Sequence, residues 1–221
     1  PVCTELSQLG DQLLDLRRAA ADVCVEAGGR LVACGATPFA ETDVSVPAGE
    51  RYQAIARHYG PLAFEPALCG CHVHVGIPDR HTGVMILNWL RPWLPVLQAL
   101  SVNSPLWQGA DSGYHSWRAI QIQHWPSTAP NPPLCSADEY DSVVKTLVSS
   151  GVILDERLLN WHARLSARYP TIEVRIADVG ATVSDALLLA ALVRAMVATA
   201  ITAGRQAAVE PVSGVVMAAA H

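Results

Sequence analysis

Two histidines, His72 and His74, lie within residues 69–78, where valines alternate with polar residues and glycines and a proline bound the run. This pattern predicts a short strand with one buried face. Because side chains at i and i+2 of a strand point the same way, both imidazoles would project from one face, with Val73 and Val75 on the other. Paired imidazoles can bind a divalent cation, or can combine a metal ligand with a hydrogen-bond donor to an anionic substrate. The alternative is two histidines whose hydrogen bonds are satisfied inside a polar core.

A second alternating stretch, residues 171–178, carries a carboxylate and a guanidinium two positions apart. Glu173 and Arg175 occupy one face of this predicted strand. The other face is apolar and consists of Ile172, Val174 and Ile176. An apolar face demands burial, so we expect this strand to cover a core. The alternative is a Glu–Arg pair on a solvated face.

The two polar faces would converge if both strands lay in one sheet. The resulting site would hold two imidazoles, a carboxylate and a guanidinium. Carboxylate and imidazole groups suit Mg²⁺ or Mn²⁺, and an arginine, which keeps its charge, suits phosphate. Phosphoryl transfer from a metal-bound nucleotide requires this mixture of groups, so the two stretches together favour that chemistry.

Four linked motifs, in order along nearly the whole chain, carry a resemblance to a known family. They are CGCHVHVGIP at 69–78, NSPLWQG and DSGY within 103–114, Trp161 with RLS at 164–166, and IEVR at 172–175. These motifs resemble the type 2 glutamate–cysteine ligase family of carboxylate–amine ligases. The resemblance implies an α+β fold like the catalytic domain of glutamine synthetase, with an antiparallel (mixed) sheet and helices packed on one face.

The resemblance also implies an ATP-dependent ligase that activates the γ-carboxylate of glutamate as an acyl phosphate, which the amine of cysteine or another amine then attacks. ATP and Mg²⁺ (or Mn²⁺) are the implied cofactors. We expect His72 and Glu173 to be metal ligands. Arg175 is expected to act on the transferred phosphoryl group, with Arg164 as a second catalytic arginine. The residues expected to contact substrate are His74, Asn103, Trp107 and Arg118.

Family members begin with an earlier strand that bears clustered glutamates, and this sequence contains no Glu-Glu pair. We therefore expect residues 1–221 to be a single domain and a fragment of a longer ligase catalytic domain. The alternative function is an incomplete, non-catalytic domain or subunit that needs a partner segment. A zinc hydrolase built on His72 and His74 is a third hypothesis, which lacks a third ligand at recognisable spacing and a nearby general base.

Composition limits the partners of the chain. Its net charge of -5, without a basic cluster, argues against nucleic acid, and its hydrophobic fraction of 51% argues against disorder. The apolar run 186–203 is short for a membrane span and contains Arg194, so we expect a buried core helix and no membrane contact. Six cysteines without CxxC spacing, and no signal peptide, predict free thiols and a cytoplasmic protein. Small-molecule substrates are the expected partners, and a homo-oligomer is compatible with the sequence.

The remaining segments are expected to position these residues. Hydrophobic periodicity and capping residues predict helices over 5–27 (capped by Thr4), 51–59, 80–101 (kinked at Pro92 and Pro95), 137–149 and 186–203 (with a helix start at Ser184 and Asp185). Residues 219–221 are expected to lie in a further helix. Short apolar runs predict strands over 31–34 and 152–154. The irregular stretch 107–133 is rich in tryptophan and predicts an ordered lid, in which Arg118 either binds a substrate carboxylate or braces the loop. Asp178 is expected to cap the turn after its strand.

Overall fold

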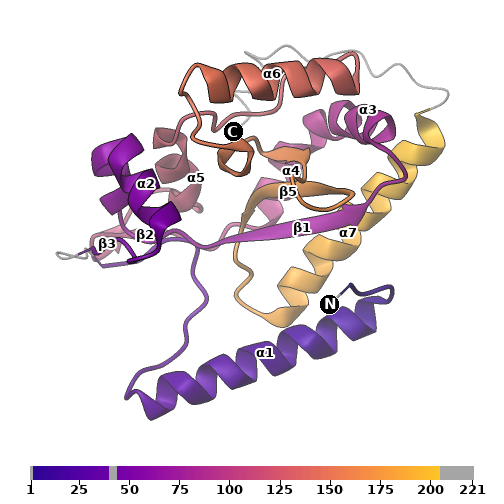
Figure 1. Cartoon of the computed structure of the whole chain (residues 1–221). Coiled ribbons are helices and arrows are strands. Elements are labelled where there is room, and N and C mark those ends of the chain that lie inside the picture. Colours follow the sequence, from indigo (N-terminus) through magenta and orange to yellow (C-terminus); the bar gives the residue numbers. More distant parts are fainter. Residues whose placement is uncertain (1, 40–43, 205–221) are drawn as a thin grey trace.

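A three-stranded antiparallel sheet lies at the centre of the computed structural model, which describes residues 2–39 and 44–204 (Figure 1). The strand order is β1 (Gly70–Gly76), β5 (Thr171–Asp178) and β4 (Ala163–Leu165). Two short strands, β2 (Leu106–Trp107) and β3 (Ala110–Asp111), form a separate hairpin. Both sheets are antiparallel, so the predicted α+β class is confirmed, while the likeness to glutamine synthetase stays a prediction.

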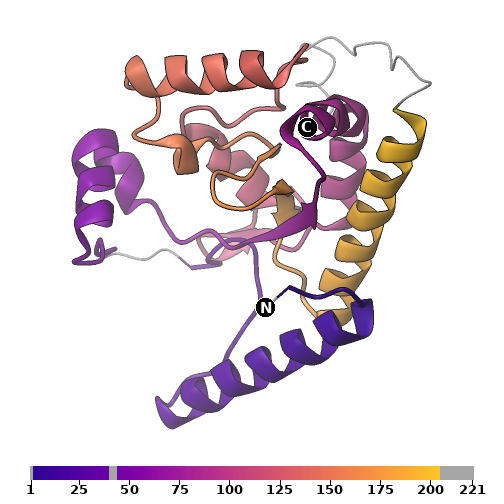
Figure 2. The same ribbon diagram turned by 45° about the vertical axis from the view of Figure 1, so that its right-hand side comes forward.

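Helices pack against the central sheet and against one another (Figures 1 and 2). They are α1 (Leu6–Glu26), α2 (Glu50–Tyr59), α3 (Arg80–Leu90), α4 (Leu94–Leu100), α5 (Trp117–Gln121), α6 (Ala137–Ser149) and α7 (Val183–Ala203). Short 3-10 turns are η1 (Gly60–Phe64), η2 (Arg91–Trp93), η3 (Ile122–His124) and η4 (Glu156–Leu158). Helices α3, α4 and α7 contact the strands, α6 packs on α3, and α1 lies along α7. The helical layer therefore supports the strands that carry the candidate site.

The core forms where the apolar face of the sheet meets these helices. Val73, Ile172 and Val174 are buried there, as the alternation of their strands predicts. They join a cluster with fully buried residues of the helices, among them Ile86, Leu87, Leu90, Leu94, Val193 and Val197. Burying one such side chain contributes about 1.5–3 kcal/mol. Because this face is buried, the polar side chains of β1 and β5 lie on the opposite face, where they form the candidate site.

The pairing of β1 with β5 contains a β-bulge opposite His72. The pairs on either side of the bulge are Cys71 with Ala177 and Val73 with Val174. Strand β5 therefore places two residues, Arg175 and Ile176, opposite His72 alone. A bulge bends the strand and redirects side chains, and here it does so beside the predicted catalytic arginine.

Most of the predicted helices are confirmed, with corrections at their ends. Asp79 caps α3 by accepting a hydrogen bond of 2.8 Å from the backbone of Thr82. The predicted kink at Pro92 is confirmed as the turn η2 between α3 and α4. Thr4 was the wrong N-cap, because Glu5 caps α1 through a capping box with Gln8. Helix α7 begins at Val183, after the N-cap Thr182, just before the start expected at Ser184 and Asp185.

Both minor strand predictions are wrong. Residues 31–34 are irregular, and Val32 is 73% exposed, because no neighbouring strand pairs with the run in the described structure. Residues 152–154 form a turn after α6, in which Ile153 is fully buried and its N–H donates to the carbonyl of Leu147. In both cases the apolar run is too short to establish a strand without a partner.

Helix α7 is buried on one side. Leu189, Val193 and Val197 lie in the core, whereas Leu188 and Ile201 are exposed. By length and composition α7 could cross a membrane, although only 28% of its apolar window is buried inside the structure. The predicted buried core helix is therefore confirmed for one side of α7, while its other side is exposed. The helix expected near the C-terminus lies outside the described residues.

Candidate active site

The polar faces of β1 and β5 converge on the carboxylate of Glu173. His74 and Glu173 are direct cross-strand partners, and the Oε1 atom of Glu173 lies 3.7 Å from His74 Nε2 and 3.3 Å from His72 Nδ1. Arg175 donates a hydrogen bond to the same oxygen, and its Nη1 lies 3.1 Å from His72 Nδ1. The predicted grouping of two imidazoles, one carboxylate and one guanidinium is therefore present. It joins two strands that are about a hundred residues apart in sequence.

Arg164 reaches the other oxygen of the same carboxylate from β4. It is the cross-strand partner of Glu173, and its Nε donates to Oε2 over 2.8 Å. Its Nη1 donates to the backbone carbonyls of Leu159 and Arg157 over 2.7 and 2.9 Å. Both side chains of the Arg164–Glu173 pair are buried. Arg164 thus connects the carboxylate to the turn that precedes β4.

The surrounding cations keep Glu173 ionised. Burial acts to raise the pKa of Glu173, but hydrogen bonds to His72 and Arg164 and the charges of Arg175 and Arg164 outweigh it, so the pKa lies well below its ordinary value. A carboxylate held in this state offers negative charge to a cation at any pH near neutrality. It also balances two arginines that would otherwise repel each other.

The two histidines are held in the neutral form. Burial lowers the pKa of His72 below its ordinary value, against the opposing effect of Glu173 and with help from Arg175. Burial likewise lowers the pKa of His74, whose Nδ1 lies 2.9 Å from the hydroxyl of Thr171. A neutral imidazole can accept a proton or bind a metal ion, so both side chains have the state that the predicted chemistry requires.

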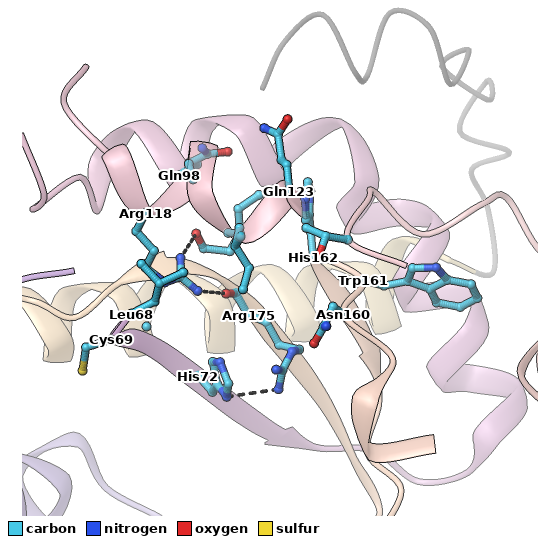
Figure 3. Close-up of a pocket in the computed structure, with 15 residues that line it drawn as sticks. Leu68, Cys69, His72, Gln98, Arg118, Gln123, Asn160, Trp161, His162 and Arg175 are labelled. Atoms are coloured by element: carbon cyan, nitrogen blue, oxygen red, sulfur yellow. Dashed lines mark hydrogen bonds between the residues drawn. The ribbon is translucent and has the colours of Figure 1, made fainter. Parts of the chain in front are cut away.

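A pocket of about 360 Å³ adjoins this cluster (Figure 3). His72 and Arg175 line it from the sheet, and Arg118 lines it from α5. Its other polar lining residues are Gln98, Gln123, Thr128, Asn160 and His162. The hydroxyl of Thr128 is buried without a hydrogen-bond partner among the described residues. A molecule in this pocket would meet positive charge at one end and amide and hydroxyl groups around it.

Arg118 lies in the pocket wall, but its guanidinium binds the protein backbone. Its Nη2 donates to the carbonyl of Arg175 and its Nη1 to that of Ile176, each over 3.1 Å. The side chain is buried, and Nη1 also lies 3.5 Å from Asp178 Oδ1. These contacts match the bracing alternative that the sequence left open, and substrate binding by Arg118 stays a prediction.

The structure does not bring Asn103 and Trp107 into this pocket. The side-chain amide of Asn103 donates to the backbone carbonyls of Ala33 and Val179, each over 2.9 Å. Trp107 lies in the β2–β3 hairpin, with its ring centroid 5.7 Å from that of Trp117. Neither residue lines the pocket, so this geometry does not support their predicted contacts with substrate.

Sequence reasoning missed the role of Asp178, which is buried rather than a simple turn cap. Its carboxylate accepts hydrogen bonds from the hydroxyls of Ser104 and Ser116, over 2.6 and 2.9 Å, and from the backbone N–H of Asn103, over 2.9 Å. An acid at the end of a buried strand was the available signal, because a buried charge must have partners. Asp178 ties the motif at 103–114 and helix α5 to the end of β5.

The described residues offer suitable donor types for a cation but few acidic ligands. Within 2–39 and 44–204, no group of three or more His, Cys, Asp and Glu side chains is arranged to hold a metal ion. The proposed ligands His72 and Glu173 are adjacent, and Glu173 also binds two arginines. The six cysteines are free thiols.

Comparison with known proteins identifies one family. The model of glutamate-cysteine ligase family 2 matches residues 1–221. A protein from Salinispora arenicola named "Putative glutamate--cysteine ligase 2" is 50% identical over the whole chain and 59% of its own length, and one of the same name from Salinispora tropica is 49% identical over the same shares. "Putative glutamate--cysteine ligase 2-1" from Nocardia farcinica is 48% identical over 90% of the chain and 52% of its own length. The chain thus spans less than two thirds of these relatives.

Proposed function

Because the chain belongs to glutamate-cysteine ligase family 2, we propose that it is part of an ATP-dependent carboxylate–amine ligase that joins glutamate to cysteine or to another amine. The names of its relatives refer to the glutamate–cysteine reaction. The observation that carries the proposal is the convergence of Arg164, Arg175, His72 and His74 on Glu173 beside a pocket.

The chemistry of this reaction explains why such a cluster is useful. A carboxylate and ATP are both anions, so their approach must be relieved by positive charge. Transfer of the γ-phosphoryl group to the γ-carboxylate of glutamate forms an acyl phosphate and ADP. The amine nitrogen then attacks the acyl carbon, phosphate leaves, and the nitrogen loses a proton. Each step places negative charge on oxygens of the phosphoryl group.

Arg175 is the residue we assign to that charge. Its guanidinium lies at the pocket wall, is held by Glu173, and keeps its proton throughout the reaction. Arg164 is buried behind the same carboxylate and does not line the pocket, so instead of the catalytic role expected from the sequence we assign it to hold Glu173 in place. His74 contacts the same oxygen of Glu173 as Arg175 but does not line the pocket, and we assign to it the contact with substrate or phosphate that the sequence predicts.

Glu173 and His72 suit a Mg²⁺ or Mn²⁺ ion in donor type. The described residues alone do not supply three His, Cys, Asp or Glu ligands, so the phosphates of ATP and further ligands would have to complete the coordination. A bound divalent ion would supply charge neutralisation between the nucleotide and the glutamate carboxylate. Arg164 and Arg175, for their part, fix the orientation of the Glu173 side chain beside the pocket.

An activity assay on the full-length protein tests this function. Incubation with ATP, Mg²⁺, glutamate and cysteine should release ADP and form an equal amount of γ-glutamyl product, measured by mass spectrometry. Omitting either amino acid should stop both signals, and replacing cysteine by other amines defines the acceptor. Absence of ADP and of product with all substrates present would reject the ligase.

An incomplete domain or subunit is the second candidate, because the chain spans about three-fifths of the length of its most similar relatives reported above. A purified natural protein with the mass of the printed sequence, inactive until a second chain is added, would favour it. A longer protein that is active alone would favour the ligase.

A further inference from the structure

The guanidinium of Arg118 lies against the β-bulge of β5 (Figure 3). It donates one hydrogen bond to the carbonyl of Arg175 and one to the carbonyl of Ile176, the two residues that face His72 across the bulge. A bulge disrupts the ladder of backbone hydrogen bonds, and a buried carbonyl without a partner costs about 1–3 kcal/mol. Arg118 therefore supplies donors at the point where the ladder is irregular.

We infer that Arg118 is a positioning residue, which fixes the backbone of Arg175 and thereby the place of its guanidinium in the site. The inference rests on the proposed function, in which Arg175 acts on the transferred phosphoryl group. It assigns Arg118 an effect through Arg175 and not through direct contact with substrate. The following contacts support it.

Arg118 is itself held in place by contacts within the protein. Its backbone N–H donates to Ser104 Oγ over 3.1 Å, and its side chain is 6% exposed. Asp178, which binds Ser104 and Ser116, lies 3.5 Å from Arg118 Nη1. The guanidinium thus contacts a buried carboxylate as well as the two carbonyls of β5, so its position is fixed by the protein itself.

Gly70 provides the space in which this guanidinium lies. A Cβ atom built at Gly70 would be 2.4 Å from Nη2 and 2.9 Å from Cζ of Arg118. Real Cβ atoms do not approach other heavy atoms so closely, so a larger residue at this position would displace Arg118 from the bulge. Gly70 pairs with Asp178 across the sheet, which places this space at the end of β5.

The same residue, Arg175, accepts from Arg118 through its carbonyl and contacts His72 and Glu173 through its side chain. A shift of its backbone would move the guanidinium relative to both partners. A misplacement of about 1 Å can cost a catalytic group about 10²-fold in rate. Arginine suits this task better than lysine, because its planar fork presents two donors at a fixed spacing.

Arg118→Lys in the full-length protein tests the inference, since lysine keeps the charge but not the fork. We expect kcat to fall about 10- to 100-fold, while KM for glutamate changes less than about twofold. Arg17→Lys is the matched control, because Arg17 also donates to two consecutive carbonyls, those of Gly180 and Ala181, but lies outside the pocket lining. Arg17→Lys should leave kcat within about twofold of the wild type.

A second variant and a spectroscopic readout separate positioning from other roles. Gly70→Ala keeps Arg118 but should displace it, and it should lower kcat in the same way. In ¹⁵N-arginine spectra, the Nε–H signal of Arg175, assigned through Arg175→Lys, should shift in Arg118→Lys and Gly70→Ala but not in Arg17→Lys. An unchanged Arg175 signal, or a rise in KM for glutamate at constant kcat, would overturn the inference. If the wild type shows no ligase activity, the proposed function fails, while the Arg175 signal still decides whether Arg118 positions it.

Discussion

Arg164 on β4 and Glu173 on β5 face each other directly across the sheet, with Arg164 Nε 2.8 Å from Glu173 Oε2 and both side chains buried. Breaking a buried ion pair by removing one partner leaves an uncompensated charge. The pair is therefore the structural foundation of the candidate site, because Arg175, His72 and His74 all contact the other oxygen of Glu173.

Arg164→Ala should destabilise the protein strongly. It removes the partner of a buried carboxylate and the donor to the carbonyls of Leu159 and Arg157, so we expect a loss of about 3–5 kcal/mol in the free energy of unfolding. Urea denaturation measures this change. The control, Arg168→Ala, alters an exposed arginine and should cost less than about 0.5 kcal/mol. Equal midpoints for the two variants would contradict the assignment.

The stabilisation by Glu173 should depend on pH. Although burial acts to raise it, the pKa of Glu173 lies below its ordinary value because of His72, Arg164 and Arg175, so the carboxylate stabilises the native state when it is ionised. This contribution is fully present above the unfolded pKa of about 4.3 and is lost as the pH falls below it toward the native pKa.

Unfolding free energies of the wild type and Glu173→Gln, measured between pH 3 and pH 8, test this sign. Their difference should be constant from pH 6 to pH 8 and should shrink below about pH 4.3. A difference that grows on acidification would show that the carboxylate is not held by the cations around it.

Tyr140 should titrate late. Burial raises the pKa of Tyr140 to about 12. Its hydroxyl donates to the carbonyl of Leu165 over 3.3 Å and accepts from the backbone N–H of the same residue over 3.2 Å. The ultraviolet difference titration between the wild type and Tyr140→Phe should therefore place the tyrosinate signal well above pH 10, the ordinary value. A midpoint near pH 10 would mean that the hydroxyl is accessible to water.

Asp178→Asn should loosen the connection between α5 and the sheet. The change removes a charge that accepts from Ser104 and Ser116 and lies near Arg118, and we expect a cost of about 2–4 kcal/mol. Thermal unfolding measures it, with Asp15→Asn, an exposed position on α1, as the control. A melting temperature equal to that of the control would show that the buried carboxylate contributes little.

The convergence of β1 and β5 could be predicted because strand alternation fixes which side chains share a face. His72, His74, Glu173 and Arg175 lie together for the reason the sequence suggested. The bulge at His72 could not be predicted from the alternation of either strand, and the residue that donates to its carbonyls, Arg118, comes from another part of the chain. Periodicity describes one strand, whereas register depends on two strands and their surroundings.

The failures elsewhere have a similar cause. Residues 31–34 have the composition of a strand, yet Val32 is exposed, because pairing needs a neighbour that local sequence does not reveal. The burial of Asp178 depends on Asn103, Ser104 and Ser116, which lie more than sixty positions earlier. Long-range polar contacts of this kind determine the site as much as the strands do.

The most direct measurement for the central claim is the rate of ADP formation by Arg175→Gln in the full-length protein, with ATP, Mg²⁺, glutamate and cysteine at saturation. If Arg175 stabilises the transferred phosphoryl group, kcat should fall by about 10²- to 10³-fold relative to the wild type, the scale of removing one donor to transition-state charge, while Arg168→Gln keeps wild-type activity. A kcat for Arg175→Gln equal to that of the wild type would contradict the account, because the convergent side chains of β1 and β5 would then not form the phosphoryl-transfer site.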